Sequence, residues 1–586
     1  MTHLVSLSAL FVPLLALGAM VGCTSSRSVV QPRGEQPPDF GPNVLILAPG
    51  DPAAQAKVDG IFAQQESSQF GPDRFAILLA PGEHHVTIPV GFYTQVLGLG
   101  ASPADTRVRG SITSKPFLKN RNATCNFWRS IENLTLTPDG GTNIWAVSQG
   151  TWLRRVHVRG DIIFSDGGWS SGGFLADSRI DGIVDSGTQQ QWFSRNTSWG
   201  QWHGGNWNMV FVGVENPPPG QWPEKPYTTV DAAPVVREKP YLSMEGDRFA
   251  VRVPGLTRDA RGPTWGGNDA SVSATAPREG TSLGIESFYI AHAGRDTAAS
   301  INEALASGKN LLLTPGLYEL DAPIEVTRPG TVVLGLGYPT LTPTRGNAAL
   351  AVGDVDGATI AGIIFEGSEI ESPDLVQVGP SGASTSHKQS PTLLADITCR
   401  TGGARNGRAG SLLTINSKDV IIDNAWLWRA DHGEGAAWDS NTTRNALVVN
   451  GDDVTAYALF AEHTQQYQTL WNANGGRVYF YQSEMPYDPP SPQAWSHDGI
   501  TGYASYKVSP NVTMHEAWGL GIYCVFRGSP VIAHTAIEAP EGPQASGVKF
   551  HHVVTIRLNG LPDSGIAHVI NDRGEPVVHS KKATID

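Results

Sequence analysis

The chain has 586 residues, of which 40% are hydrophobic and 17% are charged, a composition that excludes long disordered tails. Its 66 glycines and 41 prolines are too many for a helical protein and favour short strands joined by turns. The net charge of −13 repels phosphate backbones, so we expect no nucleic acid partner.

The chain starts with an apolar stretch over residues 4–23 that ends in small residues, as is typical of a secretory signal. The residues ending at Cys23 are similar to a lipoprotein box. We therefore expect a signal peptide over residues 1–23 and a secreted protein, or one lipid-anchored through Cys23 at the cell surface or in the periplasm. No later segment reaches the ~18 apolar residues of a membrane span, so we expect no transmembrane segment. The other cysteines lack C-x-x-C spacing and are predicted to be free thiols: Cys125, Cys399 and Cys524.

Two segments repeat one pattern, LLAPGEHHVTIPVGFYTQVLGLG at 78–100 and LLTPGLYELDAPIEVTRPGTVVLGLG at 312–337. Each contains a short apolar strand, a Pro-Gly turn, a β-rich stretch and a second apolar strand. The repetition predicts two similar domains in tandem. Residues 296–310, which precede the second copy and contain Gly308, have the spacing of a short helix.

Short β-branched runs separated by Gly, Asn and Asp follow each copy, for example at 358–367 and 419–430. Their repeat of roughly 20 residues, without long helices, predicts coils of a right-handed parallel β-helix, with a β-sandwich as the alternative. Strands that are apolar throughout favour the β-helix, because parallel sheets are covered on both faces. We therefore predict an all-β fold of two tandem right-handed parallel β-helix domains at 40–215 and 286–586, joined by a linker or connector arm at 216–285.

Glu462 and Glu484 form the sharpest candidate site, because the 22 residues between their positions correspond to about one coil. The same register aligns Phe460 with Gln482. Neighbouring parallel strands lie ~4.8 Å apart, so the two carboxylates would stack at nearly that distance. Like charges that close do not both ionise readily, and one pKa rises. A carboxylic acid that stays protonated near neutral pH is what cleavage of a glycosidic bond requires.

Aromatic residues crowd the region of this pair and the end of the first domain. Aromatic faces in a groove bind sugar rings by apolar stacking. The candidate substrate-binding residues are Trp202, Trp207, Trp438, Trp471 and Tyr487, together with Gln482.

Six segments carry a resemblance to a known family. Four of them resemble, in order and spacing, the catalytic half of glycoside hydrolase family 55: WLWRADHGEG at 426–435, LFAEHTQQYQTLW at 459–471, YQSEMPYDPP at 481–490 and HEAWGLGIY at 515–523. Two more look like the end of the first domain and the connector of the bacterial members: SRNTSWGQWHGGNWNMVFVGVENPP at 194–218 and PYTTVDAAPVVREKPYL at 226–242.

This resemblance implies two β-helices packed side by side, with a cleft between them and exo- or endo-acting hydrolysis of β-1,3-glucan with inversion. It makes Glu484 the general acid and Glu462 its close neighbour, which tunes the acid and holds substrate or water. We expect a polysaccharide substrate, no cofactor or metal, and a monomer.

The catalytic base is left open. Inverting enzymes usually keep their carboxyl groups ~6.5–9.5 Å apart, and a stacked pair is closer than that. A water held by other polar groups is therefore needed, and Gln189, Gln191 and His203 are candidates from the first domain.

A second acidic set departs from the family pattern. Asp452 and Asp453 are adjacent, and Asp431 lies 22 positions before Asp453, so a second acidic column would stand beside the glutamates. Turn aspartates are the alternative reading. If the column acts, the protein is a β-helix hydrolase of another glycan, of the α-1,3-glucan or galacturonan type. A polysaccharide lyase and a non-catalytic glycan-binding surface protein are the remaining alternatives.

Overall fold

The computed structural model describes residues 38–265 and 280–586, and residues 39–586 form one compact unit. The predicted signal and Cys23 lie outside the described residues. Within the described part of the chain, no helix is long and apolar enough to cross a membrane. The three described cysteines carry free thiols, and two of them, Cys399 and Cys524, are buried.

The first β-helix is built on a 15-stranded sheet whose pairings are parallel. Its main path runs through β1 (Val44–Leu47), β2 (Phe75–Leu79), β5 (Thr94–Gly98), β8 (Arg129–Thr137), β10 (Trp152–Val158), β12 (Phe174–Ala176), β14 (Gln191–Arg195), β16 (Asn208–Val212) and β17 (Tyr227–Val230). A branch includes β3 (Gly82–His85), β6 (Thr106–Arg109), β9 (Thr142–Ile144), β11 (Asp161–Ile163), β13 (Arg179–Asp185) and β15 (Ser198–His203).

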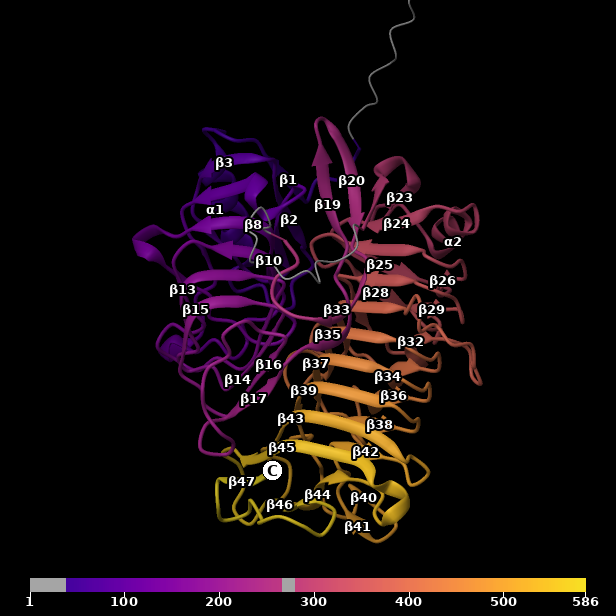
Figure 1. Ribbon diagram of the computed structural model, residues 1–586. Coiled ribbons are helices and arrows are strands. Elements are labelled where there is room, and N and C mark those ends of the chain that lie inside the picture. Colours follow the sequence, from indigo (N-terminus) through magenta and orange to yellow (C-terminus); the bar gives the residue numbers. More distant parts are fainter. Residues whose placement is uncertain (1–37, 266–279) are drawn as a thin grey trace, which may run out of the picture. The chain divides into compact units, whose positions relative to one another are not determined.

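The second β-helix has two long sheets, whose strands stack as successive rungs in Figure 1. One runs through β23 (Phe288–Ala291), β24 (Asn310–Leu313), β27 (Val332–Gly335), β30 (Thr359–Ala361), β33 (Leu393–Thr401), β35 (Ile421–Arg429), β37 (Thr455–Glu462), β39 (Gly476–Glu484), β43 (Met514–Cys524), β45 (Gly547–Arg557) and β47 (Lys582–Ile585). The other contains β26 (Ile324–Val326), β29 (Leu350–Val352), β32 (Ser372–Val378), β34 (Ala409–Ile415), β36 (Thr443–Val449), β38 (Thr469–Trp471), β42 (Tyr506–Val508), β44 (Ile532–Glu538) and β46 (Gly565–Ile570). The predicted all-β parallel fold is confirmed.

The internal duplication is visible in the structure. In each copy an apolar strand, β2 or β24, pairs in parallel with the V-L-G strand that follows, β5 or β27. The glycine of each Pro-Gly turn has a positive φ, +134° at Gly82 and +156° at Gly316, which explains why glycine is needed there. The predicted helix is α2 (Ala298–Ala306), whose N-cap Thr297 accepts a hydrogen bond from the Ser300 backbone. A matching helix, α1 (Ala54–Gln65), precedes β2 and was not predicted.

The connector at 216–285 is more structured than a linker. Besides β17, it forms a two-stranded antiparallel sheet and a three-stranded one. Alternating apolar and polar residues, as in YLSME and RFAVRV, outweigh the prolines and glycines nearby. The strands are β18 (Ala233–Arg237), β19 (Tyr241–Glu245), β20 (Arg248–Val253), β21 (Leu256–Ala260) and β22 (Thr281–Gly284).

The two β-helices pack against each other through a shared core of aromatic residues. The ring centroids of Phe127 and Trp426 lie 4.6 Å apart, and those of Trp152 and Tyr338 lie 4.8 Å apart. Arg154 of the first β-helix is 3% exposed and donates to carboxylates of the second. These contacts confirm the side-by-side arrangement that the family resemblance implies.

Candidate active site

Glu462 and Glu484 are the last residues of the neighbouring parallel strands β37 and β39 and pair with each other in the register of the sheet. Phe460 pairs with Gln482 in the same register, so the predicted alignment is confirmed. Adjacent parallel strands lie ~4.8 Å apart, and residues in register point to the same face. The two carboxyl groups therefore occupy consecutive rungs at the same end of the sheet.

Glu462 is 3% exposed, and both of its carboxylate oxygens accept hydrogen bonds. Gln149 Nε2 donates to Oε1 at 2.8 Å, and Trp426 Nε1 donates to Oε2 at 2.8 Å. Gln149 belongs to the first β-helix, between β9 and β10. Ser171, from the same β-helix, shares hydrogen bonds with the Gln149 side-chain amide at 3.3 and 3.4 Å. The site is therefore assembled from both β-helices.

The surroundings of Glu462 favour its protonated form. Burial raises the pKa of Glu462 to about 7, and the negative charge of Asp431 adds to the shift. Hydrogen bonds from Trp426, Gln482 and Gln149 work against it. With a pKa near 7, Glu462 can accept and release a proton at neutral pH.

Glu484 differs from Glu462 in being partly exposed. The Tyr487 hydroxyl donates to its Oε2, and Gln482 Nε2 donates to its Oε1 at 3.5 Å. Burial of much of the carboxyl group raises the pKa of Glu484 well above its usual range, and the charge of Glu462 raises it further. These surroundings therefore favour the protonated form of Glu484, and its partial exposure leaves it accessible to a substrate oxygen.

Asp431 lies two residues after the end of β35, near the two glutamates, and its charge contributes to the raised pKa of both. Its Oδ1 is 2.8 Å from His432 Nδ1. Burial opposes ionisation of Asp431, but the hydrogen bond from His432 outweighs it and lowers the Asp431 pKa below its usual range. The same contact outweighs burial at His432 and raises the pKa of the imidazole to about 10. Asp431 is thus a permanently charged neighbour of the pair.

The predicted acidic column of Asp431 and Asp453 is wrong. Ile421 pairs with Thr455, so the coil between β35 and β37 is longer than the one between β37 and β39. Asp453 therefore precedes β37, whereas Asp431 follows β35 at the opposite end of the strands. The equal spacing in sequence did not correspond to equal positions on the coils.

Asp452 and Asp453 are turn aspartates, as the alternative reading had it. Asp453 has a φ of +57°. Asp452 Oδ1 accepts a hydrogen bond from the Asn474 backbone N–H at 3.0 Å, and its carboxylate lies 3.1 Å from Lys418. Both residues cap the turn before β37, and the hydrolase that would use them as catalytic groups is not supported.

Three of the predicted substrate-binding residues lie beside Glu484. Tyr487 and Gln482 contact its carboxyl group, as described above. Trp207 is partly exposed and packs on Tyr523 with ring centroids 5.0 Å apart, and Tyr523 is the register partner of Glu484 on β43. Trp438, in the loop after β35, is also partly exposed, with the Arg429 guanidinium 5.5 Å from its ring.

Trp202 and Trp471 are in the wrong place to bind substrate. Trp202 is 8% exposed and packs on Trp199 and Phe211 in the core of the first β-helix. Trp471 is fully buried in the core of the second, against His515. A tryptophan inside a coil and one on its outer face look alike in sequence, because both serve to cover apolar surface.

The residues proposed to hold water have different outcomes. Gln189 is fully buried and bonded to the backbone of Val147 and Gly172. Gln191 donates to the Ser171 carbonyl at 2.9 Å and so supports the segment that contacts Gln149. His203 is exposed on β15 and bonds Gln201 at 3.2 Å, so it does not join this group.

Three residues of the site were not singled out from the sequence: Gln149, Ser171 and Trp426. The first two lie more than 290 positions from Glu462 in the chain, and no local motif marks them. Trp426 stands in the Trp-rich strand WLWR, which gave a usable signal.

Comparison with known proteins places these residues in a familiar setting. A family model described as LAM55 pectate lyase-like domain matches residues 288–484 and thus ends at Glu484. An exo-beta-1,3-glucanase from Streptomyces sp. (strain SirexAA-E / ActE) is 46% identical over 542 residues, which cover 92% of this chain and 87% of that protein.

Two solved structures from the same organism are similar along nearly their whole length. The structure of sacteLam55A from Streptomyces sp. SirexAA-E superposes with a TM-score of 0.89 at 44% identity and covers 94% of this chain and 98% of that one. A variant of sacteLam55A in complex with glucose has the same TM-score and coverage at 45% identity.

Proposed function

The chain belongs to glycoside hydrolase family 55, and on that premise we propose that it hydrolyses β-1,3-glucan from a chain end, with inversion, using Glu484 as the general acid. The observation that carries this proposal is the pair of in-register carboxyl groups at the ends of β37 and β39, one of them partly exposed and with a raised pKa. The name of the Streptomyces relative supports the glucan and the exo action.

Glu484 supplies the proton that the leaving oxygen needs. Its raised pKa favours the protonated form, and its partial exposure leaves the carboxyl group open to a substrate. The Tyr487 hydroxyl donates to Oε2 and fixes the orientation of the carboxyl group. As the glycosidic bond breaks, the proton moves from Glu484 to the leaving oxygen, and Glu484 becomes a carboxylate.

A water molecule supplies the nucleophile on the opposite face of the sugar. The two stacked carboxyl groups lie ~4.8 Å apart along the sheet. This distance is shorter than the ~6.5–9.5 Å that separates the two carboxyl groups in most inverting enzymes. In this reading, Gln149 and Ser171 hold the water, and Glu462, which Gln149 contacts at 2.8 Å, accepts its proton. The water oxygen then bonds to the anomeric carbon as the glycosidic bond breaks.

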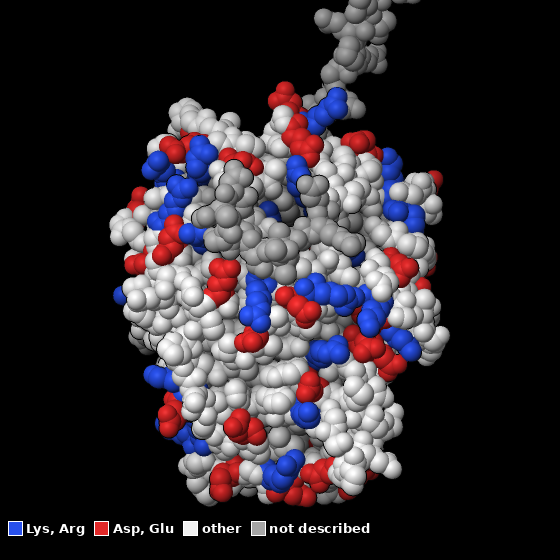
Figure 2. Space-filling view, in the orientation of Figure 1, with Lys and Arg blue, Asp and Glu red and all other residues white. Residues whose placement is uncertain are grey.

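The accessible surroundings suit a neutral sugar polymer. Trp207 and Trp438 are partly exposed aromatic rings on the segments that form the site, and such rings stack on sugar faces. Figure 2 shows acidic and basic side chains interspersed over the described part of the visible face rather than gathered in one basic region. An anionic polymer such as pectate or alginate would favour a basic surface.

A substrate panel tests the proposal. The protein is incubated with laminarin, α-1,3-glucan, mixed-linkage glucan, pectate and alginate, and reducing sugar and unsaturated products are measured. We expect reducing sugar from laminarin, released as small products from the chain end, with the α-anomer first in proton NMR. Unsaturated products from pectate or alginate, or release from α-1,3-glucan alone, would contradict it.

Export and a monomeric state are further parts of the proposal. The apolar stretch ending at Cys23 supports a secreted or lipid-anchored protein. Fatty-acid labelling of the wild type and of Cys23→Ser in the producing cell separates the two, since a lipid anchor would be lost in the variant. Light scattering of the secreted form measures the oligomeric state.

A further inference from the structure

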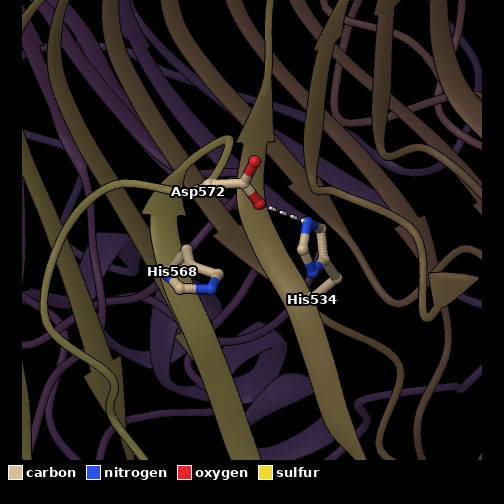
Figure 3. Close-up of side chains that lie close together, drawn as sticks. All are labelled: His534, His568 and Asp572. Carbon is tan, nitrogen blue, oxygen red and sulfur yellow. Dashed lines mark ion pairs between the residues drawn. The ribbon is translucent and has the colours of Figure 1, made fainter.

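Two histidines and an aspartate lie together at the end of the second β-helix, in the nine-stranded sheet rather than the sheet that carries the glutamates. His534 is on β44, His568 is on β46, and Asp572 is in the turn after β46. Figure 3 shows the three side chains turned toward one another, with an ion pair between His534 and Asp572. One potential ligand atom from each residue lies within 4.8 Å of the others, and His534 Nε2 is 3.1 Å from Asp572 Oδ1.

We propose that His534, His568 and Asp572 bind a divalent transition-metal ion of the Zn²⁺ type. Atoms that share a tetrahedral Zn²⁺ at ~2.1 Å lie about 3.4 Å apart. The present separations therefore need only small side-chain rotations. The His534 and Asp572 side chains are free to make them, being 39% and 84% exposed. An imidazole pair with one carboxylate suits Zn²⁺, Ni²⁺ or Cu²⁺, whereas Mg²⁺ and Ca²⁺ require mostly oxygen ligands.

The space beside the three residues leaves room for the rest of the coordination shell. A surface cavity of about 210 Å³ is lined by His534 and Asp572, together with Glu538, Lys507 and Asn571. Lys507 pairs with the Glu538 carboxylate, so its charge is balanced and does not oppose a cation at the histidines. Water from the open side of this cavity would complete the fourth position.

A metal ion at this site would link the edge strand of the sheet to its neighbouring strand. β46 is the edge strand of the nine-stranded sheet, and β44 is its neighbour. Asp572 belongs to the turn that leaves β46, so one ion would join the edge strand and its turn to the strand before it. Edge strands are where a sheet opens first, and an ion that binds the folded form raises its stability. The site is therefore structural and independent of the proposed hydrolysis.

Zn²⁺ titration of the untagged full-length chain tests this site by calorimetry. We expect one strong equivalent of Zn²⁺ in the wild type and none of comparable strength for Mg²⁺. In His534→Ala and His568→Ala, Zn²⁺ binding should weaken at least about 100-fold, because even groups that only orient metal ligands are worth roughly 10–100-fold. Asp572→Asn should weaken it less. The matched control is His85→Ala, which removes an exposed histidine 3.2 Å from Glu83 in the first β-helix, away from this cluster, and should bind like the wild type.

Thermal unfolding gives the second readout. Zn²⁺ should raise the melting temperature of the wild type and of His85→Ala but leave that of His568→Ala unchanged. In EDTA all the proteins should have the same melting temperature, which would show that the variants fold. Equal Zn²⁺ binding by the wild type, His534→Ala and His568→Ala would overturn the proposal, as would no binding by the wild type at millimolar Zn²⁺.

Discussion

Two pairs of acidic residues stand on four successive strands of the same long sheet of the second β-helix, and their surroundings differ. Asp396 on β33 and Asp423 on β35 meet cations: Arg154 donates to both, at 2.8 and 2.9 Å to Asp396 and at 2.8 Å to Asp423. Arg195 also donates to Asp423 at 2.9 Å. Both arginines come from the first β-helix, so this group joins the two halves of the molecule.

Glu462 and Glu484, on β37 and β39, meet neutral donors instead. In the described part of the chain their hydrogen-bond partners are the amides of Gln149 and Gln482, the indole of Trp426 and the hydroxyl of Tyr487. Two full charges ~4.8 Å apart at an effective dielectric constant of ~20 would repel by about 3.5 kcal/mol. Neutral donors do not offset that repulsion.

The difference separates a structural group from a chemical one. Burial would raise the pKa of Asp423, but the charges of Arg154 and Arg195 outweigh it and lower the pKa. At Glu462 and Glu484 burial prevails, and both pKa values rise. A carboxylate held ionised by arginine adds cohesion, whereas a carboxyl group that is poised near neutral pH can transfer a proton.

The largest effect is expected from Glu484→Gln. The substitution preserves size and hydrogen bonding but removes the proton that the leaving oxygen must receive, and general acid catalysis contributes roughly 10²–10⁴-fold in rate. We expect kcat on laminarin to fall by about that factor with the melting temperature unchanged.

Asp453→Asn is the control for this variant, because Asp453 is an exposed turn residue. It should keep wild-type activity. Full activity in Glu484→Gln, or its loss in Asp453→Asn, would show that the chemistry lies elsewhere than in the glutamate pair.

Asp423→Asn should have the next largest effect, on stability rather than on rate. It removes a negative charge that compensates the positive charges of Arg154 and Arg195 in a buried interface. Breaking a buried ion pair in this way lowers the free energy of unfolding by about 3–5 kcal/mol. Urea unfolding measures the loss. Asp452→Asn, which removes a partly exposed ion pair with Lys418, should cost at most about 1 kcal/mol. If Asp423→Asn and Asp452→Asn lowered the free energy of unfolding equally, the buried ion pairs of Asp423 would contribute no more to stability than a partly exposed ion pair.

The sequence predicted one side of the site well and the other hardly at all. The spacing of Glu462 and Glu484 predicted their register, because one coil separates the two residues and its length equals that spacing. The same spacing failed for Asp431 and Asp453, because coil length varies with the loops between strands. Gln149 and Ser171 were missed because the contact between the β-helices depends on tertiary packing, which no local pattern encodes.

Gln149→Ala tests the missed half of the site. It removes a hydrogen bond to an ionisable carboxyl group. Such a bond contributes about 1.5–3 kcal/mol, which corresponds to a fall in kcat of roughly 10- to 150-fold. Because this bond favours the ionised form, its loss should raise the pKa of Glu462 above its value of about 7. The low-pH limb of the kcat profile, where Glu462 must lose its proton to act as base, should therefore move to higher pH.

Gln201→Ala is the matched control, since Gln201 is exposed on β15 of the first β-helix and bonds His203. It should leave both the rate and the pH profile unchanged. A slower Gln149→Ala enzyme with an unshifted pH profile would mean that Gln149 does not set the pKa of Glu462.

The smallest effect concerns a buried histidine whose charge is compensated by two carboxylates. His387 is 1% exposed, with Nδ1 2.8 Å from Asp356 Oδ1 and Nε2 2.8 Å from Asp354 Oδ1. Burial opposes its charge, but the hydrogen bonds to the two carboxylates prevail and raise the pKa of His387 above the usual value. The charged imidazole therefore stabilises the fold.

That stabilisation is fully present below the unfolded pKa of ~6.5 and is lost as the pH rises through the higher folded pKa. The urea midpoint of the wild type should thus exceed that of His387→Gln most at pH below 6 and least in alkaline solution. His84 gives the opposite sign, because its burial lowers the His84 pKa, so any stability that the wild type has over His84→Gln should shrink as the pH falls. If the differences in urea midpoint for His387→Gln and His84→Gln were both independent of pH, these imidazoles would contribute to stability through packing and not through charge. The contrast between the two carboxylate groups would then lose its electrostatic basis.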